Sequence, residues 1–155
     1  MKNYETVASY LATRYEEKFG EQIDEMKLQK LMYLVQRESL ARTDKPLFET
    51  EIQGWRLGPV LPDLRGFYKE NALNGFPKVL GSDMGEDQAV VDAVFDEYAD
   101  RESLSLSRMT HGEISWRKSR RGIHPSESSS NTIPLDDIRL DALRIQGLRM
   151  MEDDE

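Results

Sequence analysis

The chain has 155 residues, of which 38% are hydrophobic and 32% charged, and its formal net charge at pH 7 is −8. This size suits one domain with a single core, and the negative charge argues against general affinity for nucleic acid or anionic membranes. The chain has no cysteine, which excludes disulfides and thiolate metal or redox sites.

The N-terminal residues show no apolar signal core, and no run approaches the ~20 apolar residues that span a bilayer. We therefore expect a cytoplasmic protein with no membrane partner.

Apolar residues at three- and four-residue spacing predict a first helix over residues 4 to 19. Asn3 is the expected N-cap, and Gly20 is expected just past the last turn.

A second helix is predicted to begin after an N-cap at Asp24 and to end in the turn at residues 43–46. Its apolar stripe is wide, which is typical of a helix contacted from several sides, so we expect it at the centre of the fold. Lys27, Gln29 and Lys30 are expected on its narrower polar face.

Two short strands are predicted next, over residues 46–48 and 52–55, joined by residues 49–51. A lone hairpin needs support, which the first two helices are expected to supply. Gly58 and Pro59 are expected to break the second strand, because they favour backbone conformations outside a regular ladder.

A third, short helix is predicted over residues 60–68 and a loop over residues 71–85. An amphipathic pattern predicts a helix over residues 86–100. Its solvent-exposed side is acidic, and the stretch from Asp83 to Glu102 contains eight acidic residues and one basic residue.

Short helices are predicted over residues 106–110 and 114–121, followed by a serine-rich loop and a last helix that opens at Pro134. We expect one domain over residues 1–149 and an acidic disordered tail over residues 150–155. The fold prediction is a compact, mainly α bundle of five to seven helices with one small antiparallel β-hairpin.

Searches for catalytic patterns find little. The chain has no P-loop, dinucleotide-binding or nucleophile-elbow motif, and its two histidines, His111 and His124, lack metalloprotease spacing. A metal-dependent hydrolase that uses His111 with Glu113 remains a third-ranked alternative, and we expect no enzyme activity, no cofactor and no metal. The basic residues 117–121 lack the interleaved aromatics of a single-strand platform, which argues against a nucleic-acid partner.

Three sequence blocks carry a resemblance to a known family. Leu28-Gln29-Lys30-Leu31-Met32-Tyr33 resembles a Leu-Gln-Lys-Leu-x-Tyr motif, and Trp55-Arg56-Leu57-Gly58-Pro59-Val60 resembles a Trp-x-x-Gly-Pro-Val motif. The block from Leu106 to Trp116 resembles Leu-x-x-x-Thr-His-x-x-x-x-Trp, with Thr110 and His111 at its centre. In order and spacing the blocks are similar to the Panacea domain, the SocA-like antitoxin family of bacteria and phages, over about residues 4–145.

The resemblance implies an antitoxin that binds and blocks a cognate toxin encoded nearby, or alternatively an adaptor that delivers the toxin to a housekeeping protease. Steric occlusion is the expected mechanism, with the acidic stretch from Asp83 to Glu102 steering a basic toxin. Trp55 is expected to face the core and Arg56 the partner. The candidate partner-binding residues are Lys27, Lys30, Trp55, Arg56, Gly58 and Pro59. The residues assigned to the motifs or to structure are Leu28, Gln29, Leu31, Tyr33, Val60, Thr110, His111 and Trp116.

Overall fold

A computed structural model describes residues 1–153 of the chain and confirms the mainly α fold with an antiparallel hairpin. The elements in chain order are α1 (Tyr4–Phe19), α2 (Glu25–Thr43), β1 (Gln53–Trp55), β2 (Gly58–Val60), α3 (Pro62–Asn74), α4 (Gly81–Met84), the 3-10 turn η1 (Gly85–Asp87), α5 (Gln88–Tyr98), α6 (Ser103–Thr110), α7 (Ile114–Ser119) and α8 (Leu135–Asp153).

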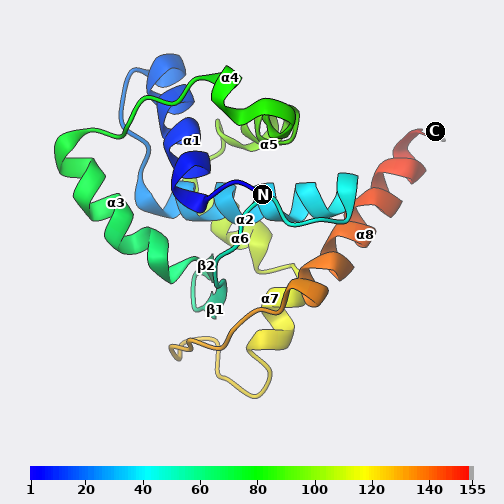
Figure 1. Ribbon diagram of the computed structural model, residues 1–155. Helices are drawn as coiled ribbons and strands as arrows, with labels where there is room; N and C mark the ends of the chain where they lie inside the picture. The colour runs from blue at the N-terminus through cyan, green and yellow to red at the C-terminus, as the bar shows by residue number, and fades with distance from the viewer. Residues whose placement is uncertain (154–155) are drawn as a thin grey trace.

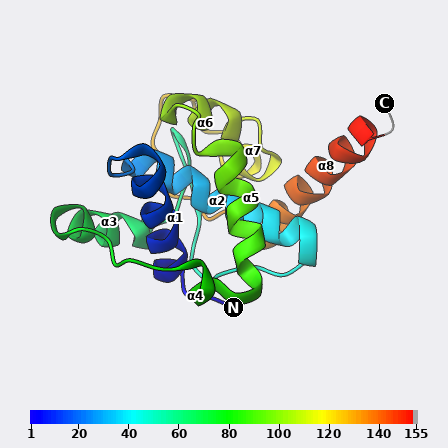
Figure 2. The ribbon, with the colours of Figure 1, turned by 90° about the horizontal axis from the view of Figure 1, so that it is seen from above.

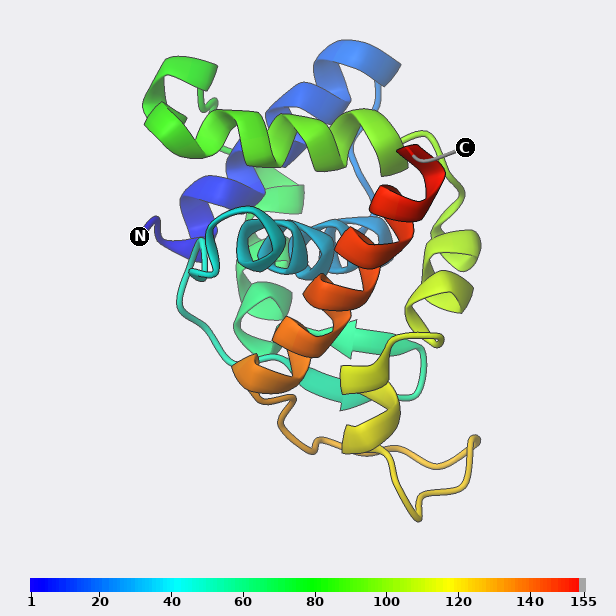
Figure 3. The ribbon, with the colours of Figure 1, turned by 90° about the vertical axis from the view of Figure 1, so that its right-hand side faces the viewer.

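Helix α2 lies at the centre, as its wide apolar stripe predicted. Every residue from Lys27 to Ala41 is buried. Helices α1 and α5 pack on one side of α2, and the hairpin and α6 pack on the other (Figures 1 and 3). Helix α8 crosses the C-terminal half of α2 and its own C-terminal end projects outward (Figure 2).

The ends of the first two helices follow local sequence signals. The side chain of Asn3 accepts a hydrogen bond from the backbone N–H of Thr6, and Asp24 does the same for Lys27 at 2.8 Å. Gly20 ends α1 in the left-handed conformation with φ 73°. Such caps stabilise a helix by about 1 kcal/mol each, and the predicted bounds of both helices are confirmed.

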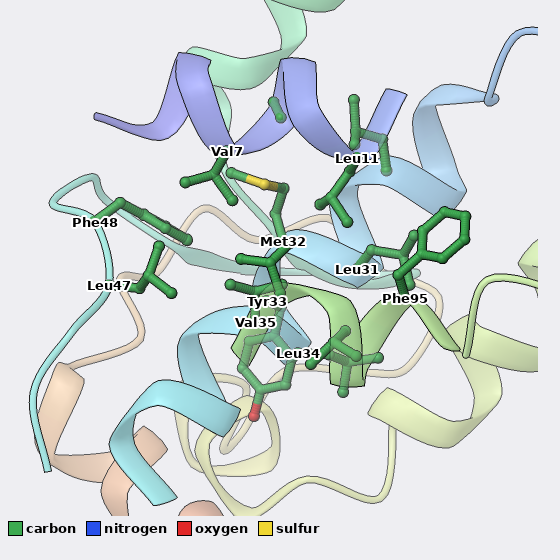
Figure 4. Packing of buried hydrophobic residues seen from close by; sticks show 14 of the residues in the cluster. Val7, Leu11, Leu31, Met32, Tyr33, Leu34, Val35, Leu47, Phe48 and Phe95 are labelled. Carbon is green, nitrogen blue, oxygen red and sulfur yellow. The ribbon is translucent and has the colours of Figure 1, made fainter. Parts of the chain in front are cut away.

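The core is built around the apolar residues of α2. Figure 4 shows Leu31, Met32 and Leu34 of α2 among side chains from α1, α5 and the segment before β1. Phe95 of α5 and Phe48 of the segment before β1 are fully buried in this cluster. Each such side chain contributes about 1.5–3 kcal/mol relative to an exposed position.

The predicted strand partner of β1 was wrong. Residues 53–55 pair with residues 58–60, in the register Gln53↔Val60, Gly54↔Pro59 and Trp55↔Gly58. Gly58 and Pro59 therefore continue the hairpin rather than break it. The two-residue turn of Arg56 and Leu57 closes this hairpin tightly, whereas the backbone of Leu47 and Phe48 is bonded by the Gln36 side chain.

The segment predicted as a first strand has another role. Phe48 forms an isolated parallel bridge with Lys2, whose backbone N–H donates to Leu47 O at 2.9 Å. The outer edge of β1 is covered instead by residues 131–133. Gly54 N donates to Asn131 O at 2.9 Å, and Ile133 N donates to Ile52 O at 2.7 Å.

Three further elements differ from the prediction. Helix α3 begins at Pro62 and continues to Asn74, and α4 occupies part of the predicted loop over residues 71–85. Residues 150–153 continue α8 rather than form a disordered tail, and residues 154–155 lie outside the described residues. Among residues 1–153, no helix combines the length and apolar character needed to cross a membrane.

Candidate functional site

The two motifs in α2 and the hairpin meet through buried polar contacts. Lys30 Nζ donates to Pro59 O at 3.0 Å. Gln29 forms a two-way pair with the Leu61 backbone, accepting from Leu61 N at 2.8 Å and donating to Leu61 O at 3.1 Å. Because all four groups are buried, losing either side chain would leave backbone polar groups without partners.

The third motif holds the hairpin from the opposite side. Trp116 Nε1 donates to Trp55 O at 2.7 Å, and Ser107 Oγ donates to Leu57 O at 2.6 Å. The His111 ring stacks on Trp116 with centroids 4.3 Å apart. Burial, together with the nearby Lys30 charge, lowers the pKa of the His111 imidazole.

Gly58 sits where these supports converge. Its φ is +119°, a conformation that side chains disfavour. A Cβ at this position would lie 2.7 Å from Thr110 Oγ1 and 2.9 Å from Lys30 Cε. The three blocks therefore share a physical task, which is to fix a tightly packed hairpin between α2 and the α6–α7 corner.

Arg120 adds a clamp that the sequence did not reveal. Its guanidinium is buried and donates to Gly54 O at 3.2 Å and to Glu127 O at 2.6 Å. The guanidinium thus ties the serine-rich loop to β1, so this member of the basic residues 117–121 serves the fold.

A groove of about 390 Å³ opens beside the hairpin. Its lining residues come from α2, the hairpin, α3 and the serine-rich loop: Glu25, Met26, Lys30, Trp55, Arg56, Leu57, Val60, Arg65, Ser128 and Ser129. Three of them are basic and one is acidic, so the groove is locally positive on a chain of net charge −8.

Trp55 forms a wall of this groove and is half-buried, which corrects the expectation that it faces the core. Its indole N–H donates to Gln53 Oε1 at 2.8 Å, and the Arg65 guanidinium lies 5.1 Å from its ring centroid. Gln53 and Trp55 point to the same face of β1, and both are only half-buried, whereas Gly54 between them is buried.

Arg56 and Leu57 form the exposed tip of the hairpin, and Leu57 retains 41% of its surface. Arg56 therefore occupies the turn between β1 and β2. None of residues 1–153 forms a hydrogen bond or ion pair with its guanidinium.

The narrower polar face predicted for α2 is not a surface of the folded protein. Lys27, Gln29 and Lys30 are buried, because neighbouring elements cover α2 on all sides. Lys27 Nζ donates to Ala99 O at 3.0 Å, next to α5 and away from the groove. Long side chains can bury their stems and bring the charged end to a carbonyl, which helical periodicity alone does not distinguish from exposure.

The remaining motif residues are interior. Leu28, Leu31 and Tyr33 are fully buried, and Val60, Thr110 and Pro59 are buried as well. Sequence reasoning missed the contribution of Met26, Arg65 and the serine-rich loop to the groove, because only the fold brings these segments together.

Sequence reasoning also missed a buried polar network under α7. Arg37 forms an ion pair with Glu113 and donates to Tyr98 OH at 3.0 Å. Asp141 accepts from the backbone N–H groups of Ile114 and Ser115 at 2.7 and 2.9 Å. The signal for this network in the sequence was the presence of charged residues, such as Arg37, inside the apolar stretch of α2.

The network perturbs the acid that it encloses. Burial raises the pKa of Glu113 to about 7, and the nearby Asp141 carboxylate adds to the rise while Arg37 opposes it. Arg37 pairs with Glu113, whereas Asp141 is held by the N–H groups of α7 and by Tyr33 OH, so the Asp141 carboxylate close by disfavours ionisation of Glu113.

His111 and Glu113 do not converge on a common site. Glu113 faces Arg37, whereas His111 lies against Trp116. Within residues 1–153, no group of three His, Cys, Asp or Glu side chains is placed to hold a metal ion.

The acidic stretch lies on α5, on the other side of α2 from the hairpin (Figures 1 and 3). Part of its charge is already engaged, since Arg14 binds Asp92 at 2.9 Å and Asp96 at 3.4 Å. The predicted steering surface and the predicted contact residues therefore do not form one continuous face.

Comparison with known proteins supports the resemblance over part of the chain. A family model described as antitoxin SocA-like, Panacea domain, matches residues 28–80. This segment contains the α2 and hairpin motifs, and the block from Leu106 to Trp116 packs against it from outside the match. No curated protein and no solved structure matches the chain.

Proposed function

We propose that this chain is an antitoxin that neutralises a cognate toxin by direct binding, with the hairpin tip and the adjoining groove as the contact face. The family match supports the antitoxin role, because residues 28–80 contain α2 from Leu28 onward, the hairpin and six of the ten groove residues. The choice of contact face rests on the groove. It presents Trp55 and Arg56 of the hairpin beside Arg65 of α3, and the hairpin is fastened at both sides.

The composition of this face suits protein recognition. Tryptophan and arginine supply a disproportionate share of interface energy when a partner excludes water from them. Leu57 adds an exposed apolar side chain at the tip. Because the hairpin is already ordered by Lys30, Ser107 and Trp116, binding requires little additional ordering, which favours affinity.

Four of the six predicted partner-binding residues belong to the hairpin, and these four divide into two groups. Trp55 and Arg56 contact the toxin, whereas Gly58 and Pro59 are buried and hold the hairpin in shape. Lys27 lies next to α5 and does not belong to this face.

The test is co-expression of the chain with the protein encoded beside its gene. That neighbour should arrest growth when expressed alone, and the wild-type chain should restore growth. A neighbour that is harmless alone, or that stays toxic beside the chain, contradicts the proposal.

A second assay separates occlusion from delivery to a protease. The purified chain should inhibit the purified toxin with no protease present. If inhibition fails in the purified pair while the chain shortens the toxin's half-life in cells, the adaptor alternative is correct instead.

A further inference from the structure

Lys30 has more hydrogen-bonding capacity than residues 1–153 use. Its ammonium group carries three N–H donors, yet its side-chain hydrogen bond in the described structure is the one to Pro59 O at 3.0 Å. The residue is only 2% exposed. A buried charge is normally paired and fully hydrogen-bonded, so this ammonium is incompletely satisfied.

The nearby acid does not supply the missing partner. Glu25 also lines the groove, but its carboxylate is engaged by Arg65 at 3.3 Å and by Gln29 at 3.4 Å. Burial lowers the pKa of Lys30 to about 8, and Glu25 only partly opposes this shift. The free protein therefore bears the cost of a charge that it does not neutralise.

The groove opens onto this group from outside. Lys30 lines it together with Arg56 and Arg65, which gives a local excess of positive charge. Trp55, Met26 and Val60 contribute apolar surface next to the ammonium. A partner segment that complements both the positive charge and the apolar surface would present a carboxylate next to an apolar side chain.

We propose that the groove receives an acidic side chain of the bound toxin, whose carboxylate accepts hydrogen bonds from Lys30 Nζ while an adjacent apolar residue packs on Trp55. This inference rests on the proposed function and adds the chemistry of the partner segment. Lys30 then acts as the polar anchor of the interface, and Arg56 at the rim favours the same charge. If Lys30 served only to hold Pro59 O, toxin binding would not depend on a negative charge next to its ammonium group.

The experiment measures binding of a catalytically inactive form of the toxin encoded beside the chain, by calorimetry at pH 7.0 and pH 9.5. Wild-type chain is compared with Lys30→Met, which keeps most of the stem and removes the charge. Lys45→Met, at an exposed lysine just beyond the C-terminal end of α2, is the matched control. Melting curves of all three proteins are recorded under the same conditions.

We expect Lys30→Met to bind at least 10-fold more weakly at pH 7.0 and to melt at a lower temperature, because the buried Pro59 O loses its donor. We expect Lys45→Met to bind like wild type. Wild-type affinity should fall at least 10-fold between pH 7.0 and pH 9.5. In the free protein the Lys30 ammonium group has a pKa of about 8 and loses its proton above that pH. In the complex, a toxin carboxylate beside it would keep Lys30 protonated to higher pH. Lys30→Met should not show this fall.

The outcomes separate the two claims. If the wild-type chain does not bind the toxin, the proposed function and this inference both fail. If it binds, and Lys30→Met binds equally well or wild-type affinity is the same at both pH values, the inference alone is overturned. If Lys30→Met proves unstable, the pH dependence of the wild-type protein decides. A double-mutant cycle with Asp→Asn and Glu→Gln variants of the toxin then identifies the carboxylate.

Discussion

Substitution of Gly58 by alanine tests whether the three motif blocks meet as described. The new methyl group would lie 2.7 Å from Thr110 Oγ1, 2.9 Å from Lys30 Cε and 3.2 Å from Lys30 Nζ. Two costs add. Holding alanine at φ +119° costs about 1–3 kcal/mol, and overpacking costs about 1–3 kcal/mol more.

The sum is about 2–6 kcal/mol, which for a domain of this size lowers the melting temperature by roughly 10 °C. Thermal and urea unfolding followed by circular dichroism would measure it. Two other glycines separate the two costs. Gly75 has φ +86° with nothing within 4 Å of a Cβ, so Gly75→Ala shows the backbone cost alone.

Gly66 lies inside α3 with open space around it, so Gly66→Ala should stabilise the protein by about 0.5–1 kcal/mol. The reasoning is refuted if Gly58→Ala costs no more than Gly75→Ala, because the hairpin would then not be packed against Lys30 and Thr110.

Two further predictions concern the buried polar contacts. The pKa of Glu113 is raised in the folded protein from 4.5 to about 7. Its contribution to stability is therefore fully present below pH 4.5 and is lost as the pH rises through about 7, a loss of roughly 3 kcal/mol at about 1.4 kcal/mol per pKa unit. Glu113→Gln should remove this component, so the difference in unfolding free energy between wild type and variant should change across that window; a constant difference would show that Glu113 titrates normally. Trp116→Phe removes the donor to Trp55 O and should cost about 1–3 kcal/mol in urea unfolding, whereas a neutral result would mean that water replaces the bond.

Local signals predicted α1 and α2 well because the physics that sets their ends is itself local. The Asn3 and Asp24 caps act on N–H groups three residues away, and Gly20 supplies the left-handed turn. The wide apolar stripe of α2 likewise predicted that this helix lies at the centre of the fold. The family resemblance also placed Lys30, Gly58 and Thr110 in its three motifs, and these residues meet in the folded protein.

The hairpin partner and the groove could not be predicted in the same way. Pairing of β1 with β2 depends on a tight turn whose first residue, Arg56, carries no turn signal. Burial of Lys27 and Lys30 depends on what covers α2 from outside, which a single helix pattern does not contain. Arg65 and Ser129 reach the groove from segments more than sixty residues apart in the chain.

Arg56→Glu shows whether the hairpin tip and the groove bind a toxin. Arg56 is exposed at the tip, and within residues 1–153 its side chain has no hydrogen-bond or ion-pair partner. The change should therefore leave the melting temperature nearly unchanged. The measurement is the dissociation constant of the purified chain and its cognate toxin, with Arg144→Glu on an exposed position of α8 as the control.

Reversing a charge at the contact face should weaken binding by about 2 kcal/mol or more, which is roughly 30-fold. Arg144→Glu should bind like wild type. If Arg56→Glu binds the toxin as tightly as the wild-type chain, the hairpin tip does not contact the toxin and the account is contradicted.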